Sequence, residues 1–127
     1  MQTQHRTREK LLVAEDNQIN LIVVTRMLEI LGYEFDTVEC GSDCLTLFDQ
    51  NDYDLVLTDI QMPGMDGMQV ASKIRTMKKT KRDVPIVAMT ANADLAEAKK
   101  FYEAGINDVL AKPFNKAELL TCIEKWH

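Results

Sequence analysis

The sequence predicts an α/β fold in which five strands and five helices alternate along the chain. Three observations carry this prediction: short apolar runs recur, segments with helical spacing separate them, and capping or turn residues lie at the junctions. Strands that are apolar at nearly every residue are typical of a parallel sheet covered on both faces. We therefore expect a five-stranded parallel sheet with helices on both faces and right-handed connections.

Five apolar runs are the predicted strands, and they cover residues 11–16, 34–40, 54–59, 84–91 and 108–113. The first run, LLVAED, and the third, DLVLTD, change abruptly from apolar to acidic residues. The fourth, VPIVAMTA, ends in a threonine and an alanine, and the fifth, DVLAKP, ends in a lysine and a proline. Several strands therefore end in side chains that can bind or react.

Five segments with helical spacing follow these runs, and they cover residues 17–31, 42–50, 67–77, 94–104 and 115–126. In the first segment, Val24, Leu28 and Leu31 form an apolar stripe. Residues favoured at helix ends bound the segments: Asp16 or Asn17 opens the first and Gly32 follows it, Ser42 opens the second, Gly105 closes the fourth, and Asn115 opens the fifth.

Length and charge narrow the class of protein. The chain has 127 residues, which is the size of one domain, and 46% of them are hydrophobic. The formal net charge is −5, so nucleic-acid binding has no electrostatic driving force. No apolar stretch reaches the ~18 residues that a membrane span needs. We expect a disordered arm over residues 1–9, one domain over residues 10–127, and a cytoplasmic location.

Chemically active residues lie at the carboxyl ends of four predicted strands: Glu15 and Asp16, Asp59, Thr90, and Lys112. In an open parallel sheet, these ends form the ligand crevice. Three carboxylates in one crevice repel each other, and a hard divalent cation such as Mg²⁺ relieves the repulsion. The lysine and the threonine add a cation and a hydroxyl group suited to an anion. The pattern predicts a phosphoryl group on one carboxylate, with a metal ion beside it.

Asp59 is the candidate nucleophile, because it ends a buried strand and is followed by a tight turn, QMPG. The strand end would hold its oxygens open to a phosphoryl donor. The turn that begins at Gln61 can lend a backbone carbonyl to the metal ion.

These residues resemble those of response-regulator receiver domains, over roughly residues 10–126. The matching motifs are VAEDN, LTDIQMPGMDG, AMTANA and AKPF. Within the family, the segments EDNQIN, DIQMPGMDG and MTANA are most similar to receivers attached to hybrid histidine kinases. The resemblance implies a flavodoxin-like, doubly wound (βα)5 fold with the strand order 2-1-3-4-5.

The resemblance also implies a reaction and its residues. Asp59 would accept a phosphoryl group from phosphohistidine on a histidine kinase or a histidine phosphotransfer domain. Mg²⁺ or Mn²⁺ would be held by Glu15 or Asp16, by Asp59 and by the Gln61 carbonyl, whereas Thr90, Ala91 and Lys112 would contact the phosphoryl group. The Lys112–Pro113 bond would be cis. Such a domain is a signalling module, not an enzyme with a separate substrate, and we expect a monomer or a weak dimer.

The sequence departs from the family pattern at one position and varies it mildly at another. Val109 replaces the aromatic residue that usually lies on the fifth strand, so the usual aromatic switch is missing. Glu15 replaces the commoner aspartate and is longer by one methylene group.

The helix predicted over residues 17–31 also carries more apolar surface than one core face requires, at Ile19, Ile22, Val23 and Ile30. This excess fits either a broad core face or a docking surface for a helical partner, formed by Ile19, Ile22 and Val23. A helical histidine phosphotransfer domain would be such a partner.

Two other functions compete. A phosphatase that forms an aspartyl-phosphate usually has a second aspartate two residues after the nucleophile, where this chain has Gln61. A flavin-binding electron carrier of similar fold would need a phosphate loop rich in Ser, Thr or Gly after the first strand. This chain has the carboxylates of EDNQIN there instead.

Overall fold

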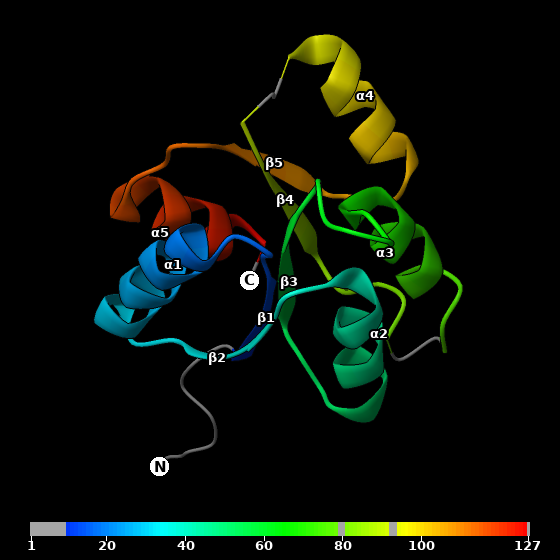
Figure 1. Ribbon diagram of the computed structural model, residues 1–127, viewed down its shortest axis with the longest axis horizontal. Coiled ribbons are helices and arrows are strands. Elements are labelled where there is room, and N and C mark those ends of the chain that lie inside the picture. Colours follow the sequence, from blue (N-terminus) through cyan, green and yellow to red (C-terminus); the bar gives the residue numbers. More distant parts are fainter. Residues whose placement is uncertain (1–9, 79–80, 92–93, 127) are drawn as a thin grey trace.

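The computed structural model describes residues 10–78, 81–91 and 94–126. It contains five parallel strands in one sheet, in the order β2-β1-β3-β4-β5 (Figure 1). The strands are β1 (Lys10–Ala14), β2 (Glu34–Val38), β3 (Leu55–Asp59), β4 (Ile86–Thr90) and β5 (Asp108–Ala111). The helices are α1 (Gln18–Leu31), α2 (Gly41–Gln50), α3 (Gly67–Ile74), α4 (Leu95–Glu103) and α5 (Lys116–Lys125).

The predicted α/β architecture and strand order are confirmed. The expected arm over residues 1–9 lies outside the described residues, as does residue 127. None of the helices in the described ranges is long and apolar enough to cross a membrane.

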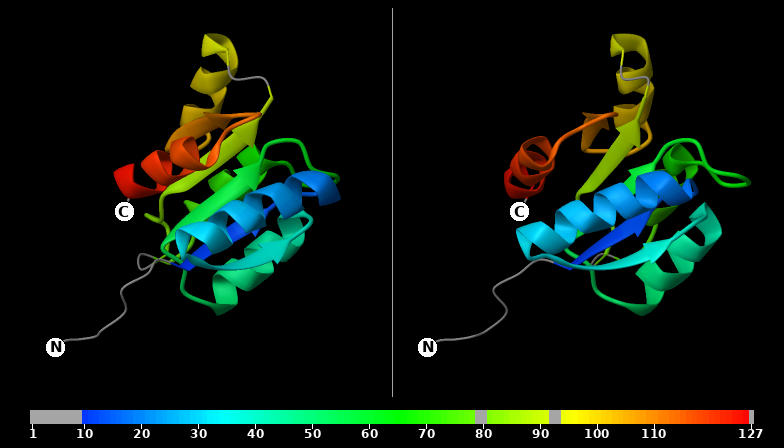
Figure 2. Two further views of the ribbon diagram at one scale, coloured as in Figure 1. Left: turned by 90° about the vertical axis from the view of Figure 1, so that its left-hand side faces the viewer. Right: turned by 60° about the vertical axis from the view of Figure 1, so that its left-hand side comes forward.

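The sheet separates two layers of helices, with α1 and α5 on one face and α2, α3 and α4 on the other (Figures 1 and 2). Alternate residues of β1 point to opposite faces. Leu11 and Val13 pack in the core under α1 and α5, whereas Leu12 and Ala14 pack in the core under the other three helices. All four side chains are fully buried, which explains why the strand is apolar at every one of these positions.

Several helix ends agree with the capping residues read from the sequence. The Asn17 side chain accepts a hydrogen bond from the Asn20 backbone N–H at 3.0 Å, so Asn17 and not Asp16 is the N-cap of α1. Gly32 ends this helix in the left-handed conformation, at φ 86°. Asn115 and Glu118 form a reciprocal capping box at the start of α5.

The expectation that Ser42 opens the second helix is wrong. Helix α2 begins at Gly41, after Cys40, which makes no side-chain capping bond. A Cβ atom on Gly41 would lie 2.5 Å from the Met65 carbonyl oxygen. Close packing against the loop before α3 therefore requires glycine at the first residue of α2, and Ser42 lies one residue inside the helix on its exposed side.

The third helix is shorter than predicted, because the chain tightens at Arg75. The N–H groups of Thr76 and Met77 donate three residues back, to Lys73 and Ile74, instead of four. The Arg75 guanidinium group then donates to the carbonyls of residues 82, 84 and 105 and to the side chain of residue 107. These bonds tie the end of α3 to the segments that lead into β4 and β5.

Candidate functional site

Three carboxylates meet where β1 and β3 end, and we call Glu15, Asp16 and Asp59 the acidic crevice. Strands β1 and β3 are neighbours in the sheet, so residues just beyond β1 lie beside the last residue of β3. One oxygen from each carboxylate lies within 4.8 Å of the others. Among residues 10–78, 81–91 and 94–126, no other group of His, Cys, Asp or Glu side chains gathers in this way.

The three carboxylates differ in exposure. Glu15 is fully buried, Asp59 is 8% exposed, and Asp16 faces solvent. The Glu15 backbone N–H donates to the Val38 carbonyl at 3.0 Å, which extends the pairing with β2 by one residue and directs the glutamate side chain inward. A cation in the crevice would therefore meet two buried ligands and one open to water.

Strands β4 and β5 bring Thr90 and Lys112 to the same edge of the sheet. Asp59 is in register with Met89, so Thr90 lies one residue further along the neighbouring strand. The Lys112 backbone N–H donates to the Thr90 carbonyl at 2.8 Å. Thr90 is 8% exposed, and Ala91 after it is exposed. The Lys112–Pro113 peptide bond is cis.

Lys112 pairs with two of the carboxylates. Its Nζ lies 2.8 Å from Glu15 Oε1 and 3.5 Å from Asp59 Oδ1. The other glutamate oxygen, Oε2, accepts the Asn17 backbone N–H at 3.2 Å. Both oxygens of Glu15 therefore have partners within the chain, and the lysine is held nearer to Glu15 than to Asp59. The sequence did not reveal this preference.

The environment of Asp59 disfavours its charged form. Burial raises the pKa of its carboxyl group, and a hydrogen bond and charge repulsion from Glu15 raise it further. The positive charge of Lys112 acts in the opposite direction but is outweighed, and the pKa of Asp59 reaches about 7. Three carboxylates share this crevice with one lysine, and a bound cation would oppose both the burial and the repulsion that disfavour the charged form of Asp59.

A tight turn follows Asp59 and packs against the sheet. The Gly67 backbone N–H donates to the Ile60 carbonyl at 2.8 Å, which closes the turn, and Gly64 within it has φ 78°. A Cβ atom on Gly67 would lie 2.5 Å from the Asp59 carbonyl oxygen, so only glycine allows this approach. Gln61 is exposed in the turn, two residues beyond Asp59.

Helix α1 presents an apolar surface to solvent on the rim of the crevice. Ile19 is 72% exposed, Ile22 55% and Val23 46%, so the broad core face considered for these residues is ruled out. Val24 and Leu28 alone among the residues of α1 are fully buried in the core. Ile30, near the other end of the helix, is also exposed. The outer face of α1 is in front in the right-hand view of Figure 2.

Val109 lies on β5, half-buried against the core formed by α2, α3 and α4. The position therefore carries a short aliphatic side chain that is already partly packed, with no ring that could turn between two orientations.

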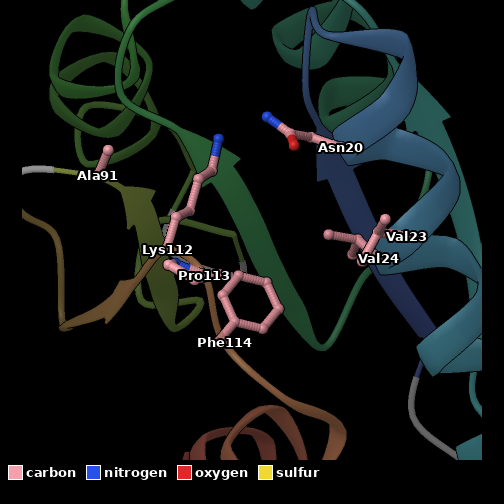
Figure 3. Close-up of a pocket in the computed structure, with 7 residues that line it drawn as sticks. All are labelled: Asn20, Val23, Val24, Ala91, Lys112, Pro113 and Phe114. Atoms are coloured by element: carbon pink, nitrogen blue, oxygen red, sulfur yellow. The ribbon is translucent and has the colours of Figure 1, made fainter.

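A pocket of about 410 Å³ lies between α1 and the connection from β5 to α5 (Figure 3). It is lined by Asn20, Val23, Val24, Ala91, Lys112, Pro113 and Phe114. The sequence did not single out Asn20 or Phe114. Helical spacing could have indicated Asn20, because it precedes the buried Val24 by four residues and lies one turn earlier on the same side of α1.

The chain matches the response regulator receiver domain family over residues 11–124. It is 40% identical over 122 residues to hybrid signal transduction histidine kinase L of Dictyostelium discoideum, and the match covers 92% of this chain and 7% of that protein. It is 38% identical over 116 residues to the aerobic respiration control sensor protein ArcB of Escherichia coli K12, covering 91% of this chain and 15% of that protein. The chain thus spans a small part of these curated relatives.

Two solved structures are similar over nearly the whole chain. The receiver domain of sensor histidine kinase PA1611 from Pseudomonas aeruginosa PAO1, with a magnesium ion coordinated in its active site cleft, has a TM-score of 0.87 and 37% identity, covering 94% of this chain and 98% of that chain. The chemotaxis response regulator CheY4 of Vibrio cholerae has a TM-score of 0.89 and 26% identity, covering 95% and 100%. The chain therefore belongs to the response regulator receiver domain family, as a receiver domain of two-component or phosphorelay signalling like those of hybrid histidine kinases.

Proposed function

We propose that this receiver domain accepts a phosphoryl group from phosphohistidine on the carboxylate of Asp59. The observation that carries the proposal is the convergence of the acidic crevice with Thr90 and Lys112 at one edge of the sheet. The Lys112 amine lies 3.5 Å from Asp59, where it can meet the negative charge of a phosphoryl group on that residue. Phosphoryl transfer depends mainly on positioning and on neutralisation of charge, and these groups supply both.

The acidic crevice fits Mg²⁺ or Mn²⁺. Both ions prefer hard oxygen ligands, and three carboxylates lie close enough to share one ion. Burial, together with the neighbouring Glu15, raises the pKa of Asp59, and Lys112 does not offset these effects. Glu15 or Asp16, Asp59 and the backbone carbonyl of Gln61 would hold the ion. When bound, such an ion neutralises charge on the phosphoryl oxygens.

Residues of the chain would carry out the transfer itself and bind the phosphoryl group. An oxygen of Asp59 forms a bond to phosphorus as the bond from phosphorus to the donor nitrogen breaks, and the electron pair of that bond stays on the imidazole. Lys112 turns from the carboxylates to the new phosphoryl group. Thr90 and Ala91, at the end of β4, hold its oxygens through the hydroxyl and the backbone N–H groups.

The test is intact mass spectrometry of the purified domain after incubation with acetyl phosphate. We expect the mass of one phosphoryl group to be added in the presence of Mg²⁺ and none to be added in EDTA. Labelling at full rate in EDTA would contradict the metal site, and the lack of any labelling with Mg²⁺ would contradict the proposed function.

The phosphohistidine donor would belong to a histidine kinase or a helical histidine phosphotransfer domain that docks on α1. A donor imidazole must approach Asp59 from the open side of the crevice, so its protein has to cover the rim. The exposed side chains of Ile19, Ile22 and Val23 offer an apolar contact there. We propose that the domain acts as a monomer or a weak dimer in the cytoplasm, alone or as the cytoplasmic part of a membrane-anchored hybrid kinase.

Ile22→Asp is expected to slow transfer from a cognate phosphohistidine protein at least fivefold, about 1 kcal/mol, because a charge enters the contact. Labelling by acetyl phosphate, which needs no docking, should keep its rate. The control is Ile30→Asp, the same change on the same helix about 12 Å further from the rim. Equal loss with both donors would place Ile22 in a structural role, and unchanged transfer would show that the partner docks elsewhere.

A further inference from the structure

Two polar groups face each other across the apolar pocket beside α1. The amine of Lys112 and the carboxamide of Asn20 project into the same space from opposite sides (Figure 3). Most of the remaining lining is aliphatic or aromatic: Val23, Val24, Pro113 and Phe114. The lysine also contacts Asp59, so the pocket opens directly beside the proposed phosphoacceptor. A ligand that reaches it from the crevice would have a charged end at Lys112 and an apolar body between the walls.

Asn20 differs from the other amides at the start of α1. The Asn17 side chain caps the helix, and the Gln18 side chain donates to Glu39 at 2.9 Å. Within the described ranges, the half-buried carboxamide of Asn20 has no hydrogen-bond partner. Asn20 is the third residue of α1, and its backbone N–H, not its carboxamide, takes part in the cap with Asn17. Helix capping therefore does not account for the carboxamide at this position.

We propose that Asn20 accepts a hydrogen bond from the imidazole N–H of the phosphodonor and so makes the domain selective for phosphoimidazole donors. This inference rests on the proposed function of Asp59. A phosphorylated imidazole has an apolar ring with a phosphoryl group on one nitrogen, and in its protonated form it carries an N–H on the other. The pocket offers a matching arrangement, with Lys112 for the phosphoryl group, aliphatic walls for the ring and an amide oxygen for the N–H.

The hydrogen bond would favour the reactive form of the donor. An oxygen of Asp59 bonds to phosphorus while the phosphorus–nitrogen bond breaks, and the electron pair stays on that nitrogen. A ring that carries a proton on its other nitrogen departs as neutral imidazole. A ring without this proton would have to depart as an imidazolate anion, which is a far poorer leaving group. An acceptor at the distal N–H therefore stabilises the protonated ring through the transfer.

The test compares two small donors, phosphoimidazole and acetyl phosphate, with saturating Mg²⁺ and intact mass as the readout. Asn20→Leu keeps the size of the side chain and removes the acceptor. We expect its rate with phosphoimidazole to fall about five- to tenfold, the usual effect of losing one hydrogen bond. Its rate with acetyl phosphate, which has no imidazole, should change less than twofold. Gln18→Leu is the matched control and should leave both rates unchanged.

The ratio of the rate with phosphoimidazole to the rate with acetyl phosphate distinguishes a loss of donor selectivity from a general structural defect. Equal loss with both donors, or an equal effect of Gln18→Leu, would overturn the role of Asn20, and so would unchanged rates in Asn20→Leu. Failure of the unsubstituted domain to react with either donor would instead overturn the proposed function itself. Asn20→Gln, which retains a longer amide, should recover part of the preference for phosphoimidazole.

Discussion

Replacement of Asp59 by asparagine is expected to abolish phosphoryl labelling completely. The amide is almost the same size as the carboxylate but is not a competent nucleophile, so the crevice keeps its shape and loses its acceptor. Intact mass after incubation with acetyl phosphate and Mg²⁺ should show no added phosphoryl group. Asp52→Asn, at a fully exposed aspartate, is the control and should label at the normal rate. Persistent Mg²⁺-dependent labelling of Asp59→Asn would show that another residue is the acceptor.

The same substitution should stabilise the metal-free domain. Burial and Glu15 raise the pKa of Asp59 from 3.8 to about 7 in the folded state. A carboxyl group whose pKa is higher in the folded than in the unfolded state destabilises the fold above the folded pKa, and the penalty disappears below the unfolded value. In EDTA, the free energy of unfolding of Asp59→Asn should exceed that of the unsubstituted domain by about 1–3 kcal/mol at pH 8.

Urea unfolding in EDTA at several pH values measures this difference. It should shrink as the pH falls through 7 and approach zero near pH 4. A variant that is less stable at pH 8 would mean that Lys112 more than offsets the charge of Asp59.

The sequence predicts the acidic crevice well because its signal is local. The apolar run before Asp59 stops abruptly, and the two acids after β1 interrupt an equally apolar run. Parallel topology then places these strand ends at one edge. The pairing inside the crevice is different, because Lys112 and Glu15 are 97 residues apart in the chain. Nothing in the local pattern says which carboxylate a flexible lysine side chain approaches most closely.

Helix α1 shows a second limit of sequence patterns. Its many apolar residues fit either a helix buried on most sides or one that docks a partner. Which of the two applies depends on the tertiary packing around the helix. In the part of the chain that the structure describes, the sheet ends at β2 and α5 alone shares this face with α1, so α1 buries one stripe and leaves Ile19 and Ile22 exposed. The glycine that begins α2 likewise packs against Met65, which is distant in sequence.

Lys112→Met is expected to reduce labelling by acetyl phosphate about 100-fold, the usual effect of removing a group that stabilises charge in a transition state. The methionine side chain keeps much of the aliphatic stem but offers nothing to the phosphoryl oxygens. Glu15 is fully buried and loses its closest partner, 2.8 Å away, so the domain should also be less stable without metal. Rates must therefore be measured at saturating Mg²⁺, with folding checked by circular dichroism.

Affinity for Mg²⁺, measured by calorimetry, distinguishes the role of Lys112 from that of the acidic crevice. The lysine is a cation, so its removal leaves more negative charge around the metal site, and the affinity should hold or rise. Lys116→Met, an exposed lysine at the start of α5, makes the same change in net charge and should alter neither affinity nor labelling. A Lys112→Met domain whose main defect is weak Mg²⁺ binding would contradict this division. The lysine would then organise the metal site, and the phosphoryl charge would have to be met by Thr90 and the metal ion alone.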